Sequence, residues 1–140
     1  MKFDMDLDGF DALDKKLRLL EPRVQKRVLQ GAVTSAIREG RKEIKKKAPK
    51  SVEQSPNSLK YGRLSQNLKV KRLKRTKPNE KMARVDTGKA FWALFYELGT
   101  RSQPARPFMS PAFKDAIPKM TQKLMERLSK GIIKEVNKIQ

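Results

Sequence analysis

The chain has 140 residues and contains neither cysteine nor histidine. The lack of cysteine excludes disulfide bonds and thiolate metal sites, and the lack of histidine removes the commonest general base and metal ligand. No apolar run approaches the roughly 18 residues that a membrane-spanning helix needs, and the first residues do not resemble a secretory signal. We therefore expect a soluble, cytoplasmic protein with no membrane contact, no cofactor and no metal.

Acidic residues are scarce, with 15 Asp and Glu against 34 Lys and Arg, and the net charge is +19. This excess predicts contact with an anionic partner, either nucleic acid or an acidic protein surface. The first 21 residues carry −2, and the remainder carries +21. Such asymmetry suits head-to-tail contact between copies. Acidic residues that favour the dipole of a first helix are the simpler explanation.

Apolar residues at three- and four-residue spacing predict the helices. One helix is expected over residues 10–20, and a long one from Pro22 to the Ala48-Pro49 pair. The apolar stripe of the long helix consists of Val24, Val28, Ala32, Val33, Ala36, Ile37, Gly40 and Ile44. A last helical region should begin at Ser110-Pro111, run to the end of the chain, and be bent or split at Pro118. Its predicted inner face is Phe113, Ala116, Ile117, Met120, Leu124 and Leu128.

Alternating apolar residues predict strands at 2–7, 66–74 and 81–87, the last two forming a basic β-hairpin. Residues 50–65, rich in Ser, Pro, Asn and Gly, predict a loop. A short helix is expected before Gly99, with Phe91, Leu94, Phe95 and Leu98 on one face. The predicted fold is a single α+β domain over residues 1–140, in which the long helix and the C-terminal helix pack on an antiparallel sheet of three or four strands.

The segment FYELGTRSQPARPFMSPAF, residues 95–113, is both apolar and loop-like. Gly99 permits a turn, and the prolines at 104 and 107 hold the chain extended on either side of Arg106. A stiff arm of this kind suits a contact surface, because less ordering is needed on binding. A proline-stiffened connector is the simpler alternative.

This segment also carries a pattern of residues: an aromatic, Glu, one residue, Gly-Thr, a gap, then Pro-Ala-Arg-Pro-Phe and Pro-Ala. The matching positions are Tyr96, Glu97, Gly99, Thr100, Pro104, Ala105, Arg106, Pro107, Phe108, Pro111 and Ala112. Upstream, a long basic helix ends at Ala48-Pro49 and is followed by a Gly-x-Leu-Ser element at 62–65 and a strand pair. With these features the chain resembles the head–tail joining or tail-completion proteins of long-tailed phages, which are small neck and minor tail components.

The resemblance implies a structural role without catalysis. Members of this family form the neck or the head-proximal end of the tail, commonly as rings of about six copies. The implied partners are other copies of the chain, the neighbouring head-connector and tail proteins, and packaged DNA. The implied location is the virion, after assembly in the host cytoplasm.

From the arm and the resemblance we predict a set of subunit or partner contacts: Glu97, Gly99, Thr100, Arg101, Pro104, Arg106, Pro107 and Phe108. Glu97 and Arg106 are expected to form a charge-assisted pair, within one subunit or across two. Trp92, Phe95 and Phe108 are expected in the core. The segments 50–65 and 99–107 are expected to be flexible loops in the free protein.

The predicted hairpin presents a basic face made of Lys69, Lys71, Arg72, Lys74, Arg75 and Lys77. This face has three interpretations: contact with DNA in the ring through its phosphates, docking on an acidic neighbour, or a solvated strand edge whose lysines discourage pairing. The alternatives remain open at this point.

Two other function classes compete with the structural one. A nucleic-acid-binding protein without sequence specificity is supported by the basic runs at 41–50 and 60–77, although only Tyr61 lies among them as a stacking platform. An enzyme would need clustered carboxylates for a divalent ion, and Asp4, Asp6 and Asp8 share one face of the predicted first strand. Solvent-facing acids on an alternating strand explain that cluster as well.

Overall fold

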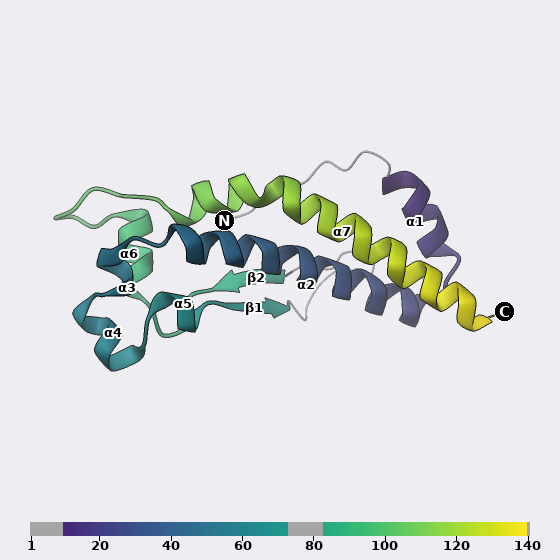
Figure 1. Cartoon of the computed structure of the whole chain (residues 1–140), viewed down its shortest axis with the longest axis horizontal. Coiled ribbons are helices and arrows are strands. Elements are labelled where there is room, and N and C mark those ends of the chain that lie inside the picture. Colours follow the sequence, from purple (N-terminus) through teal and green to yellow (C-terminus); the bar gives the residue numbers. More distant parts are fainter. Residues whose placement is uncertain (1–9, 73–82, 140) are drawn as a thin grey trace.

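The computed structural model describes residues 10–72 and 83–139, and it confirms the predicted α+β class. Two long helices form the body of the molecule, with a two-stranded sheet beside them and short helices at one end (Figure 1). The elements are α1 (Phe10–Arg18), α2 (Pro22–Lys47), α3 (Lys50–Glu53), α4 (Pro56–Tyr61), α5 (Leu64–Asn67), β1 (Lys69–Arg72), β2 (Ala83–Asp86), α6 (Trp92–Leu98) and α7 (Met109–Ile139).

Helices α2 and α7 pack along most of their length, and this contact forms the central core. The predicted stripes are confirmed: Ala32, Ala36, Ala116, Met120, Leu124 and Leu128 are buried in one cluster. Small residues on α2 allow the close approach. A Cβ added to Gly40 would lie 2.6 Å from the Phe113 ring, so a larger side chain there would push the helices apart.

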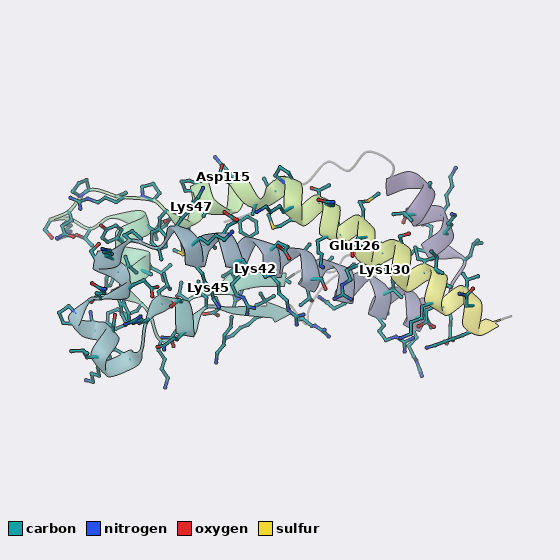
Figure 2. All side chains as sticks on the ribbon, viewed as in Figure 1. Lys42, Lys45, Lys47, Asp115, Glu126 and Lys130 are labelled. Atoms are coloured by element: carbon teal, nitrogen blue, oxygen red, sulfur yellow. The ribbon has the colours of Figure 1, made fainter. Side chains whose placement is uncertain are left out.

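Ion pairs bridge α2 and α7 toward both ends of this core, and Figure 2 labels one of them, Lys47 with Asp115. Lys47 pairs with Asp115 near one end. Arg27 Nη2 lies 2.7 Å from Glu135 Oε1 near the other end. Exposed pairs of this kind contribute about 0–1 kcal/mol each, so the apolar contact, rather than the charges, holds the helices together.

The hairpin lies on the side of α2 opposite α7, which makes α2 the middle of three layers (Figure 1). Strands β1 and β2 are antiparallel, with Lys69 opposite Asp86 and Arg72 opposite Ala83. The predicted hairpin is therefore confirmed for these strands. The expected strand at 2–7 and the turn between β1 and β2 lie outside the described residues.

The prediction of a loop over residues 50–65 is wrong, because the short helices α3, α4 and α5 occupy most of it. Helix α4 begins at a proline, and Ser55 Oγ caps it by accepting a hydrogen bond of 3.2 Å from the amide two residues on. Val52 and Leu64 are buried in the core at this end. In this segment the Ser and Pro residues stand at the beginning of a helix, where they cap it and start it, rather than in an irregular loop.

Helix α7 begins one residue before the predicted Ser110-Pro111 start and is not split at Pro118. Pro118 is exposed, so solvent can hydrate the carbonyl that loses its helical partner. Near the C-terminal end of α7, Leu17 and Leu20 pack against Ile132 and attach α1, as the spacing of residues 10–20 predicted.

Candidate functional site

The carboxylate of Glu97 is the centre of the site. It lies on α6 and is only 5% exposed. Its Oε2 accepts hydrogen bonds from the backbone amides of Phe108 (2.7 Å) and Met109 (2.9 Å). Its Oε1 accepts from the amide and hydroxyl of Ser110, at 2.9 and 2.8 Å. One side chain from α6 thus caps the first turn of α7, eleven to thirteen residues further along the chain.

The electrostatics of this cap favour an ionised Glu97. Burial by itself would raise the pKa of the carboxyl, but the hydrogen bonds from the backbone of residues 108–110 outweigh it and lower the pKa below the ordinary 4.5. The positive end of the α7 dipole acts in the same direction. Charge-assisted hydrogen bonds to backbone amides are stronger than neutral ones, so the cap fixes the end of the arm to α6.

Gly99 starts the arm, residues 99–107, with a backbone that only glycine adopts readily. Its φ is +78°, and a Cβ there would lie 2.7 Å from the backbone nitrogen of Ala105. The arm therefore folds back over the position where a side chain would stand. The tip is closed by a 2.9 Å hydrogen bond from the amide of Thr100 to the carbonyl of Gln103.

Arg106 is held beside Tyr96. Its backbone amide donates a 2.8 Å hydrogen bond to the Tyr96 carbonyl, and its guanidinium carbon lies 6.0 Å from the centre of the Tyr96 ring. The predicted pair between Glu97 and Arg106 is wrong within the subunit. The four donors of residues 108–110 occupy the Glu97 oxygens, and Arg106 stays exposed at the surface.

Helix α6 packs on the rest of the molecule through a different side from the one predicted. The predicted inner face was the one that carries Leu94, Phe95 and Leu98. Trp92 is 8% exposed and donates a 2.8 Å hydrogen bond from Nε1 to the carbonyl of Val52 on α3. Ala93 and Glu97 are buried on the same side. Trp92 is therefore in the core as predicted, and so is Phe108, which is 7% exposed.

The outer side of α6 carries large apolar side chains, which we call the α6 patch: Phe91, Leu94, Phe95 and Leu98. Their exposed fractions rise from 43% at Phe91 to 75% at Leu98. The prediction that Phe95 is a core residue is wrong, since 55% of it is exposed. Contiguous exposed apolar residues of this size are typical of an interaction surface.

The arm and the α6 patch occupy the same end of the molecule (Figure 1). Of the predicted contact residues, Thr100, Arg101, Pro104 and Pro107 are exposed along with Arg106. Glu97 and Phe108 are buried, so they hold the arm in place instead of forming its surface. The α6 patch was not predicted as a contact surface from the sequence. Apolar residues at helical spacing were taken to indicate a buried helix face, whereas these side chains are exposed.

The basic face of the hairpin is described only in part. Lys69, Lys71 and Arg72 are exposed on β1, whereas Lys74, Arg75 and Lys77 lie outside the described residues. Lys71 Nζ lies 3.2 Å from Asp86 Oδ2. The hydrogen bond from the Gly88 amide, together with Lys71, lowers the pKa of Asp86. Asp86 therefore offsets part of the positive charge of the basic face.

The chain matches no protein-family model, no curated protein and no solved structure. Within residues 10–72 and 83–139, no group of three or more acidic side chains is placed to hold a metal ion. The acidic positions 4, 6 and 8 lie outside these ranges. No helix in the described part of the chain is long and apolar enough to cross a membrane.

Replacing Glu97 by alanine should destabilise the protein by about 2–4 kcal/mol, because the buried donors of residues 108–110 lose their acceptor. Chemical denaturation followed by circular dichroism measures this. Glu126→Ala is the matched control, since Glu126 is an exposed carboxylate whose single ion pair, to Lys130, is also exposed. The control should lie within about 0.5 kcal/mol of wild type. Equal losses in the two variants would contradict the cap.

The cap should also make stability depend on pH. Because the folded pKa of Glu97 is lowered, its contribution is fully present above the ordinary value of 4.5 and is lost as the pH falls through the folded pKa. The free energy of unfolding of wild type and of Glu97→Gln, measured from pH 7 to pH 3, should therefore converge at the acidic end. A difference that stays constant or widens would show that ionised Glu97 does not stabilise the fold.

Proposed function

We propose that this protein is a structural component of a long-tailed phage virion, which forms a ring at the neck or tail end, completes the tail and joins it to the DNA-filled head. The Glu-x-Gly-Thr and Pro-Ala-Arg-Pro-Phe pattern supports the family. The proposed partners are further copies of the chain and the adjoining head-connector and tail proteins. In this role the chain is not an enzyme.

The observation that carries the proposal is the construction of the arm end. A buried carboxylate and a glycine at φ +78° fix an exposed, proline-stiffened arm beside four exposed apolar side chains. The carboxylate and the glycine also serve the fold, but the exposed side chains of the arm and of the α6 patch do not, since the core at this end is filled by other residues, such as Leu64 and Ala93. A preorganised surface loses little conformational entropy on binding, which suits repeated contact with identical neighbours.

The opposite end of the molecule offers a second surface for a ring. Leu19, Ile133 and Val136 are exposed there, near the contact of α1 with the end of α7. A contact between two different surfaces of the same chain is heterologous, and it closes into a ring when the rotation between neighbours allows. The arm end carries the exposed Arg101 and Arg106, and the opposite end carries the exposed Glu21 together with exposed bases such as Arg18 and Arg23. The proposed contact therefore rests on the apolar side chains rather than on charge complementarity.

Mass in solution tests the ring. We expect light scattering after size exclusion to show concentration-dependent growth toward about six copies, and negative-stain images to show closed rings. Phe95→Ser combined with Leu98→Ser should shift the protein to monomer, because the two most exposed side chains of the α6 patch lose their apolar contact.

The control for this experiment is Leu59→Ser, which removes a side chain that is 94% exposed on α4, outside the α6 patch. It should assemble like wild type. A wild-type protein that stays monomeric up to millimolar concentration would contradict the ring. Equal disruption by the control would show that the α6 patch has no special part in assembly.

A further inference from the structure

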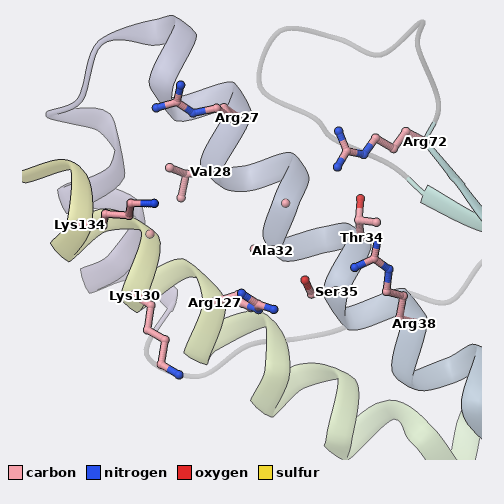
Figure 3. Close-up of a pocket in the computed structure, with 12 residues that line it drawn as sticks. Arg27, Val28, Ala32, Thr34, Ser35, Arg38, Arg72, Arg127, Lys130 and Lys134 are labelled. Atoms are coloured by element: carbon pink, nitrogen blue, oxygen red, sulfur yellow. The ribbon is translucent and has the colours of Figure 1, made fainter.

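A cavity of about 390 Å³ opens between α2 and α7, toward the end of β1 (Figure 3). We call it the basic pocket. Among the described residues, its lining includes six cationic side chains and no acidic one: Arg27, Arg38, Arg72, Arg127, Lys130 and Lys134. They come from three elements far apart in the sequence, α2, β1 and α7, so no single basic run of the sequence indicated the whole site.

Four of these six cations have no carboxylate partner among the described residues. Arg27 pairs with Glu135, and Lys130 pairs with Glu126 at 2.9 Å. In Figure 3, Lys130 extends away from α2, whereas Arg127 extends from α7 toward α2. Arg38, Arg72, Arg127 and Lys134 therefore have no ion-pair partner in the described part of the chain, although the nearby Glu126 offsets part of the charge of Arg127.

A neighbouring arginine also lacks an acceptor. The Nε of Arg41 is buried and has no hydrogen-bond partner in the described part of the chain. Arg41 lies three residues after Arg38 on α2, so the two side chains leave the same side of the helix. A buried donor without an acceptor is costly. Arg41 adds a further positive charge close to Arg38 but does not line the pocket.

We propose that the basic pocket binds the phosphate groups of duplex DNA, without reading the base sequence. Guanidinium groups present several donors in a planar fork that matches phosphate oxygens, and three of the four cations without an ion pair are arginines. Their charges attract the DNA backbone and release its counterions on binding. Contacts of this kind with the phosphates fix the position of the duplex but carry no sequence information.

The residues that line the pocket also favour duplex DNA over a single strand. Proteins that hold single strands stack the bases on aromatic side chains, and none of the described residues that line the basic pocket is aromatic. In a duplex the bases are already stacked, and only the phosphates need a partner. Arg72 belongs both to the pocket and to the predicted basic face of the hairpin, so the inference favours DNA contact for that part of the face.

Anisotropy of a labelled 20-base-pair duplex, titrated with the full chain at several salt concentrations, tests this inference without any need for ring formation. Arg38→Gln combined with Arg127→Gln should weaken binding at least tenfold at 0.1 M salt and reduce the salt slope by about two, because two phosphate contacts are lost. Both arginines are exposed, so the fold should survive the change.

Lys45→Gln combined with Lys114→Gln is the matched control. It removes the same charge from exposed positions of α2 and α7 outside the pocket, and we expect less than about a threefold effect. A further variant, Arg38→Lys with Arg127→Lys, keeps the charge but removes the fork. It should weaken binding by about threefold or more while the salt slope stays near that of wild type.

Three results would overturn the inference. The first is an equal loss of affinity in the pocket variant and its lysine control, which would mean that only net charge matters. The second is tighter binding of a single strand than of the duplex. The third is poly-glutamate competing as well as unlabelled duplex at equal charge, which would identify an acidic protein surface as the ligand.

Discussion

The hydrogen bonds of one buried carboxylate determine how the arm and α6 are held at one end of this molecule. Glu97 joins α6 to the first turn of α7, so the arm between them is anchored at both ends. The same bonds orient α6, because the side that carries Glu97 must face α7. The α6 patch is consequently directed outward, next to the arm. Without this cap, the first amides of α7 would lack an acceptor and the arm would be attached only at Gly99 and Tyr96.

The long elements could be predicted from the sequence and the short ones only in part, for a physical reason. The apolar stripes of α2 and α7 repeat over many turns, so each helix has one apolar face and one charged face. Only the apolar face can be buried, and the pattern therefore predicts which residues enter the core. Helix α6 has seven residues and apolar side chains on both sides. Its buried side is chosen by hydrogen bonds from Trp92 to Val52 and from residues 108–110 to Glu97, partners that periodicity does not reveal.

The proposed functions occupy separate surfaces. The arm and the α6 patch lie at one end of the long helices, and the basic pocket lies along their side, nearer the end that carries α1 and the last turns of α7 (Figures 1 and 3). A neighbouring subunit at the arm end therefore need not cover the pocket. Phosphate contacts without base stacking also let DNA slide, which a channel for packaged DNA requires. The pocket was missed in the sequence, because Arg38, Arg72 and Arg127 converge only in the folded chain.

The most direct test of this account is hydrogen exchange of individual backbone amides, measured by NMR on the free protein. The Glu97 cap predicts that the amides of Phe108, Met109 and Ser110 exchange at least about a hundredfold more slowly than those of Arg101 and Ser102 in the exposed arm. Exchange at residues 108–110 as fast as in the arm would contradict it, because the arm would then have no fixed end.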